Sequence, residues 1–171
     1  MTPIKDADPS LRPELTAAVI TVSDSCSRGD RVDASGPAVA RFLKERGFNL
    51  IATEIVADEQ TAIQNVILEL STKCALVVTA GGTGVAARDV TPEATRAVCD
   101  RLIEGIPERI RFEGSKETPF AALSRGLCGV CRQCLILNLP GSPKGAVESL
   151  QAVIDLLAHA LQLIGGNTEH R

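Results

Sequence analysis

Three aspartates of this 171-residue sequence come shortly after runs that are expected to be buried strands. Asp24 follows AAVITVS, Asp58 follows LIATEIV, and Asp89 comes after ALVVTA and a glycine-rich turn. Mg²⁺ is usually held by one or two carboxylates together with water and substrate phosphates. We therefore interpret Asp58 and Asp89 as candidate Mg²⁺ ligands in a site that handles phosphates. Two other interpretations stay open, in which Asp58 only caps a helix and Asp89 only pairs with Arg88.

Two glycine-rich turns could bring backbone N–H groups close to an anion, because glycine has no Cβ and accepts positive φ angles. The first turn consists of Gly81, Gly82, Thr83 and Gly84. The second contains Pro140, Gly141, Ser142 and Lys144, and the lysine could neutralise a polyphosphate. The first turn could also be only a tight turn. Its match to a dinucleotide-binding fingerprint is disfavoured, because RDVTP separates it from the next helix and it follows the third strand.

Composition argues against several other kinds of site. The sequence has two histidines, His159 and His170, and neither has a partner at catalytic or metal-ligand spacing. A net charge of −3 and 2% aromatic residues argue against nucleic acid as a partner. We see no targeting signal and no apolar run near the roughly 20 residues of a membrane span. The expectation is a cytoplasmic protein without a membrane partner.

Three of the six cysteines form a CxxCxxC pattern, which is Cys128, Cys131 and Cys134. One interpretation is a metal or iron–sulfur site. The other is small apolar side chains in a hairpin that continues into a strand. We favour the second, because a fourth ligand is missing nearby and the pattern continues directly into CLILNLP. A disulfide scaffold is not expected in a cytoplasmic protein of this size.

Strands and helices that position these residues are expected to alternate along the chain. We expect strands at 17–23, 50–56, 75–80 and 134–140, helices at 37–47, 59–73, 91–102 and 146–164, short broken helices over 104–126, and a hairpin through Gly129. Continuous apolar runs and this alternation predict a three-layer α/β/α fold with a mostly parallel central sheet. Ligands of such sheets bind beyond the carboxyl ends of the strands, so the acids and both turns should meet at one edge. We expect one domain at residues 16–166, between a flexible segment 1–15 and a tail 167–171.

Six segments closely resemble the molybdopterin adenylyltransferase family. They are ITVSDS, DASGP, VADEQ, TAGGTGVAARDVTPEAT, PFAALSRG and LILNLPGSPKGAVES, and the resemblance covers nearly all of residues 16–166. It implies the molybdopterin-binding fold and an Mg²⁺-dependent reaction. In that reaction AMP passes from ATP to the terminal phosphate of molybdopterin, and pyrophosphate leaves.

The resemblance also implies roles for individual residues and for partners. Asp58 and Asp89 match the family's two catalytic aspartates. Gly81, Gly82 and Thr83 match its phosphate and pterin loop, Ser23 and Asp24 lie near the nucleotide, and Ser124, Asn138, Pro140 and Gly141 line the substrate site. A homotrimer is expected, and molybdate insertion should fall to a separate downstream protein. The alternative function is a carrier of the same fold that binds molybdopterin without chemistry.

Overall fold

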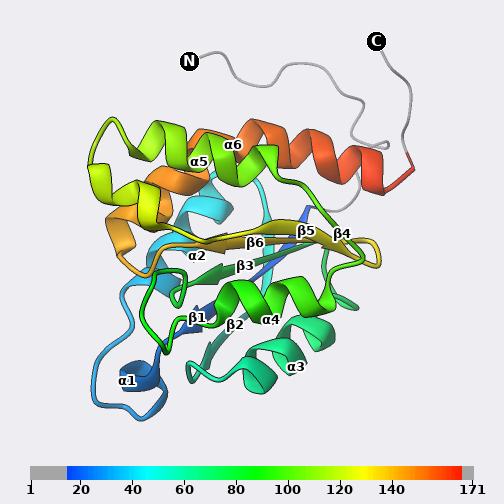
Figure 1. Cartoon of the computed structure of the whole chain (residues 1–171). Coiled ribbons are helices and arrows are strands. Elements are labelled where there is room, and N and C mark those ends of the chain that lie inside the picture. Colours follow the sequence, from blue (N-terminus) through cyan, green and yellow to red (C-terminus); the bar gives the residue numbers. More distant parts are fainter. Residues whose placement is uncertain (1–14, 167–171) are drawn as a thin grey trace.

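One six-stranded sheet in the order β2-β1-β3-β6-β5-β4 forms the centre of the structure (Figure 1), a computed structural model that describes residues 15–166. The strands β1 (Thr16–Val22), β2 (Asn49–Val56), β3 (Leu76–Ala80) and β6 (Cys134–Leu139) pair in parallel, while β5 (Cys128–Cys131) pairs antiparallel with both β6 and β4 (Arg101–Leu102). The mostly parallel sheet predicted from the apolar runs is therefore confirmed. Of the proposed end segments 1–15 and 167–171, all residues except Leu15 lie outside the described residues.

Helices cover both faces of this sheet (Figure 1). One face carries α2 (Ser35–Glu45), α5 (Gly105–Gly114) and α6 (Pro143–Ile164), and the other carries α3 (Gln60–Leu70) and α4 (Thr91–Val98). Successive strand residues point to opposite faces. In β1, Val19 packs with the first group of helices and Ile20 with the second. Because both faces are covered, the parallel strands read as continuous apolar runs. The predicted three-layer architecture is thus present.

The expected helix over 91–102 is too long, because the chain turns into an edge strand after Val98. Cys99 has an extended backbone, and the Asp100 N–H donates to the Val130 carbonyl at 2.8 Å. The carboxylate of Asp100 accepts a further bond from the Arg132 N–H at 2.7 Å. Residues 101–102 then pair with β5, so tertiary hydrogen bonds override the local helical pattern.

Two expected turn features also differ in detail. The hairpin of β5 and β6 turns at residues 132–133 and not at Gly129, and Arg132 has a φ of 57° there. The sequence TPE at 91–93 also predicts a helix cap at Thr91, but Val90 occupies that position. The Thr91 hydroxyl instead donates to the Gly81 carbonyl at 2.9 Å. This bond links α4 to the glycine-rich turn after β3.

Helix α6 is, by length and composition, apolar enough to cross a membrane, which corrects the expectation that no segment of this kind exists. Its buried face explains much of this apolar character. Leu150, Val153, Leu157 and Leu161 are at most 2% exposed and belong to the core between α6 and the sheet. Leu156 and Leu163 remain exposed on the helix. Length and hydropathy therefore do not distinguish this long core helix from a membrane span.

Candidate active site

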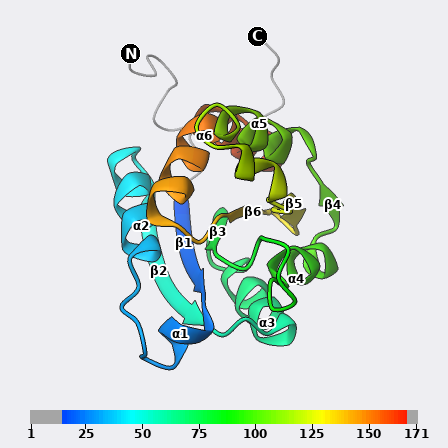
Figure 2. The same cartoon turned by 60° about the vertical axis from the view of Figure 1, so that its left-hand side comes forward.

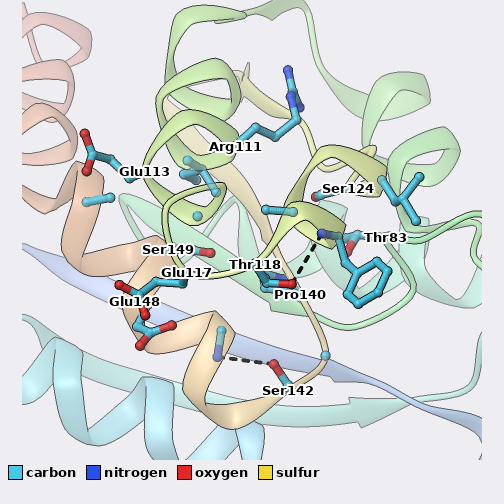
Figure 3. A pocket seen from close by; sticks show the side chains of 18 of the residues that line it. Thr83, Arg111, Glu113, Glu117, Thr118, Ser124, Pro140, Ser142, Glu148 and Ser149 are labelled. Atoms are coloured by element: carbon cyan, nitrogen blue, oxygen red, sulfur yellow. Dashed lines mark hydrogen bonds between the residues drawn. The ribbon is translucent and has the colours of Figure 1, made fainter.

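A cavity of about 900 Å³ opens beyond the carboxyl ends of β3 and β6. Its floor comes from the turns after these two strands, and its walls come from α5, the 3-10 helix η2 (Pro119–Leu123) and the first turns of α6. Figure 2 shows how α5 and α6 are arranged relative to β3 and β6. Figure 3 shows Thr83 and Ser124 on one side and Glu148 and Ser149 of α6 on the other. The volume is typical of sites for small ligands. The cavity therefore lies where strand order places a ligand site.

Eight of the residues predicted from the sequence line this cavity. They are Gly82, Thr83, Gly84, Asp89, Ser124, Pro140, Gly141 and Ser142. Sequence reasoning missed the residues of the walls, among them Arg111, Thr118, Phe120, Glu148 and Ser149. Phe120, Glu148 and Ser149 lie within two of the segments that carry the family resemblance, but the sequence pattern assigns them no role. Their part in the site depends on how η2 and α6 pack over the edge of the sheet, which the sequence pattern does not show.

The first glycine-rich turn needs glycine for steric reasons. Gly81 and Gly82 have φ angles of 114° and 64°. A Cβ at Gly81 would lie 2.2 Å from the Val22 carbonyl oxygen, and one at Gly82 would lie 2.3 Å from Thr91 Oγ1. The Gly81 N–H donates to the Leu139 carbonyl at 3.1 Å, which holds the turn against the end of β6. The backbone of this turn therefore lies close to the ends of β1 and β6, beside the cavity.

Asp24 and Asp58 bind each other's backbone at the ends of β1 and β2. The Asp24 N–H donates to Asp58 Oδ2 at 2.7 Å, and the Asp58 N–H donates to Asp24 Oδ1 at 3.0 Å. Asp58 is not a helix cap, because Glu59 holds the cap position of α3. Asp58 Oδ1 faces Gly82, since a Cβ built on Gly82 would lie 3.2 Å from this oxygen. Asp58 therefore reaches the glycine-rich turn from outside the cavity lining.

Arg88 pairs with Asp24 and not with Asp89, which corrects the second alternative interpretation. Its Nη2 lies 2.8 Å from Asp24 Oδ1 and its Nε 3.0 Å from Oδ2. Asp89 instead accepts a hydrogen bond from the Ala86 N–H at 2.9 Å, and its carboxylate faces Gly84. Both candidate aspartates are thus free of a direct guanidinium partner within residues 15–166.

Electrostatics separate the roles of the two acids after β1 and β2. The hydrogen bonds from Arg88 hold the pKa of Asp24 below its ordinary value. Burial raises the pKa of Asp58, and the nearby negative charges of Asp24 and Asp89 act in the same direction, against a hydrogen bond from the Asp24 backbone. A cation beside Asp58 would offset both effects, since an opposite charge favours the ionised form.

The residues present fit an Mg²⁺ ion that is shared with substrate phosphates. In the described part of the chain, Oδ1 of Asp58 and Oδ1 of Asp89 accept no hydrogen bond from protein, so each has an oxygen free for a ligand. No group of three or more His, Cys, Asp or Glu side chains within residues 15–166 could hold a metal ion. An all-protein cage is therefore absent there, whereas two carboxylates completed by phosphates and water suit Mg²⁺.

Five residues that were expected to bind substrate do not line the cavity, and Gly81 is one of them. Ser23 Oγ accepts from the Cys26 N–H at 3.3 Å and caps the short helix α1 (Asp24–Ser27). Lys144 is 77% exposed and lies 3.5 Å from Glu148 on α6. Asn138 is buried within β6. These side chains therefore contact other protein groups and do not face the cavity. The same holds for Asp24, which bonds to Asp58 and Arg88.

Asn138 connects three elements beneath the site. Its amide nitrogen donates to Thr79 Oγ1 at 3.0 Å and to Thr95 Oγ1 at 2.8 Å, and its Oδ1 accepts from the Leu127 N–H at 3.1 Å. The residue is 3% exposed. These bonds use both amide hydrogens and one lone pair of the oxygen. We therefore assign Asn138 to holding β3, α4 and the segment before β5 together.

Replacing Asn138 by leucine should lower the free energy of unfolding by at least about 3 kcal/mol. The change leaves the Leu127 N–H and two hydroxyls without their partners, and each buried unsatisfied group costs about 1–3 kcal/mol. Urea denaturation followed by circular dichroism measures the loss. The exposed Asn49 on β2 offers a control, since Asn49→Leu should change the midpoint little. A stability equal to that of the wild type would contradict this assignment.

The CxxCxxC cysteines lie on two faces of the sheet. Cys128 packs in the core under α5 and α6, whereas Cys131 and Cys134 pack in the core under α3 and α4. Burial raises the pKa of Cys128 to about 12 and that of Cys99 also to about 12. Thiolate is the form that binds metals, and burial disfavours it at Cys128, which also lies on the opposite face from Cys131 and Cys134. The three cysteines therefore serve as small core residues, as favoured from the sequence.

Fold and cavity together define a three-layer α/β/α protein with a ligand-sized site at the carboxyl edge of its sheet. The family model described as a probable molybdopterin-binding domain matches residues 18–159. The chain belongs to this family, as its sequence motifs indicated.

Similar proteins agree with this family over most of the chain. The molybdopterin adenylyltransferase of Helicobacter pylori J99 is 42% identical over 153 residues, which are 87% of each chain. The enzyme of the same name from Escherichia coli K12 is 41% identical and covers 82% of this chain and 74% of its own. The chain matches 26% of the length of the Drosophila molybdenum cofactor synthesis protein cinnamon, at 42% identity. The solved structure of the molybdopterin biosynthesis enzyme MoaB from Thermus thermophilus is 47% identical, with a TM-score of 0.82 over 88% of this chain and 96% of that one.

Proposed function

We propose that this protein takes part in molybdenum cofactor biosynthesis as a molybdopterin adenylyltransferase. The terminal phosphate of molybdopterin attacks the α-phosphorus of ATP, a new P–O bond forms, and the bond to the β-phosphate breaks. Adenylyl-molybdopterin and pyrophosphate are the products. The observation that carries the proposal is the convergence of Asp58, Asp89 and the glycine-rich turn at the rim of one large cavity.

This arrangement suits phosphoryl-type transfer, which needs positioning and neutralisation of charge more than covalent chemistry. The attacking phosphate is already an anion, so a catalytic histidine is not required. Asp58 and Asp89 would hold Mg²⁺, which neutralises charge on the transferring phosphate. Arg88 lies at the same edge, where its pair with Asp24 neutralises both charges.

The shape of the cavity also supports a long, mixed substrate. The glycine-rich floor can meet phosphates, because backbone N–H groups approach an anion closely where no Cβ intervenes. The walls add apolar surface from Phe120 and Leu123, which are 74% and 53% exposed. Planar ring systems such as a pterin or adenine suit apolar and aromatic surfaces.

Other parts of the proposal follow the family resemblance. We propose a homotrimer in the cytoplasm whose folded domain spans residues 16–166. A separate molybdate-insertion protein would use the adenylylated product. The apolar residues that α6 leaves exposed are compatible with subunit contacts.

The direct test is incubation of the protein with molybdopterin, ATP and Mg²⁺. We expect adenylyl-molybdopterin and pyrophosphate in equal amounts, detected by mass spectrometry and an enzymatic pyrophosphate assay. Chelation of the metal with EDTA should remove the activity, and added Mg²⁺ should restore it, because neutralisation of phosphate charge depends on the metal. Binding of molybdopterin without any product in the complete mixture would contradict the enzyme and favour the carrier.

A further inference from the structure

Arg125 joins three segments that surround the cavity. Its backbone N–H donates to the Thr83 carbonyl at 2.8 Å, its Nε to the Gly84 carbonyl at 2.7 Å, and its Nη2 to the Asp89 carbonyl at 2.5 Å. Its Nη1 pairs with Glu93 in the first turn of α4. One side chain therefore holds both ends of the loop that carries Asp89.

The neighbours of Arg125 provide a fixed base for these bonds. Ser124 lines the cavity, and the Leu127 N–H is held by Asn138 of β6 at 3.1 Å. A Cβ at Gly126 would lie 3.1 Å from the Asn138 carbonyl oxygen, so the segment packs closely on the strand. The backbone beside Arg125 is thus held on β6, while the guanidinium binds the loop 83–90.

The remaining contacts of this loop are mostly local. The Ala86 N–H binds the Asp89 carboxylate at 2.9 Å, and the Asp89 N–H binds the Ala86 carbonyl at 3.0 Å. Arg88 makes the other side-chain contact outside the loop, to Asp24. Residues 84–89 contain no helix or strand. The position of Asp89 relative to the glycine-rich turn therefore depends strongly on Arg125.

Arginine has the geometry for this role. Its planar guanidinium donates in several fixed directions at once, whereas a lysine ammonium is a compact point charge on a flexible stem. Glu93 neutralises the guanidinium, and the hydrogen bond from Arg125 lowers the pKa of Glu93. Arg125 is accordingly engaged by protein groups and not left as a free cation for substrate.

We infer that Arg125 is a positioning residue that holds the Asp89 loop in register with the glycine-rich turn. The inference rests on the proposed function for its effect on catalysis, but the loop contacts themselves do not depend on it. Asp89 and the turn must meet the same phosphates, and a displacement of about 1 Å in such a site can lower the rate about 100-fold. Arg125 would act through Asp89 and touch no substrate.

The experiment compares Arg125→Gln and Arg125→Lys with Arg46→Gln, a control at the end of α2 that removes an arginine packed over Phe42. We expect kcat for adenylylation to fall about 100-fold in both Arg125 variants. The Mg²⁺ concentration for half-maximal rate should rise in both. Arg46→Gln should keep wild-type values. Wild-type kcat and Mg²⁺ dependence in Arg125→Lys would overturn the inference, because the lysine cannot reproduce the planar set of bonds.

Hydrogen exchange measures the positioning without any reaction. The Ala86 and Asp89 amides, which are hydrogen-bonded within the loop, should exchange at least about tenfold faster in the Arg125 variants, and those of α2 should not change. Glu93→Gln, which leaves Arg125 in place, should increase exchange in the same loop by a smaller factor. Unchanged loop exchange, or faster exchange throughout the chain, would overturn the inference. If the wild type forms no product, the proposed function fails, and the exchange data still decide the role of Arg125.

Discussion

Replacing either Asp58 or Asp89 by asparagine should lower the rate of pyrophosphate release at least about 100-fold and leave molybdopterin binding largely intact. The expected size follows from the loss of a group that stabilises charge in the transition state, which typically costs 10²–10³-fold. The fold should survive, because an amide oxygen can still accept the bond from the Asp24 N–H at position 58 or from the Ala86 N–H at position 89. Only the negative charge disappears.

Single-turnover adenylylation and equilibrium binding of molybdopterin separate these effects. The control is Asp30→Asn, since Asp30 is an exposed aspartate that pairs with Arg28 outside the cavity. It should retain the wild-type rate. Wild-type single-turnover rates in both Asp58→Asn and Asp89→Asn would show that these carboxylates do not hold the metal, and the assignment of the site would be wrong.

Replacing Gly81 by alanine should lower the free energy of unfolding by about 3 kcal/mol or more. A φ of 114° is strained for any residue with a Cβ, at a cost of about 1–3 kcal/mol. The new Cβ would lie 2.2 Å from the backbone oxygen of Val22, and overpacking of this kind costs about 1–3 kcal/mol more. Neither β1 nor β3 can move easily, because both are central strands of the sheet.

Gly29→Ala is the matched control for this prediction. Gly29 also has a positive φ, of 79°, but a Cβ there would meet no atom within 4 Å. It should cost about 1–2 kcal/mol, from the backbone conformation alone. Urea denaturation of both variants gives the comparison. Equal destabilisation by the two changes would show that close packing at Gly81 contributes nothing.

Local patterns predicted the buried strands and the edge of the sheet that holds the site. The runs AAVITVS, LIATEIV and ALVVTA became β1, β2 and β3 within one or two residues. The strands β1 and β3 are buried on both faces, as continuous apolar runs predict, whereas β2 is a largely exposed edge strand. Strand order then placed the residues after β3 and β6 beside one cavity. Errors arose where distant groups compete for the backbone, as in residues 99–102, whose partners lie on β5.

The residues of the site also fall into two groups, those whose place follows from the sequence and those whose place depends on the tertiary structure. Sequence by itself determined the family, the parallel α/β architecture and the meeting of Asp89 with the two glycine-rich turns, because residue type and strand order are properties of the chain alone. Only the tertiary structure decided that Asn138 is a buried connector and that Arg88 pairs with Asp24. It also revealed that Arg125 holds the Asp89 loop. Hydrogen bonds between residues 32 to 64 positions apart follow from packing, and no local pattern records which partner a long side chain will reach.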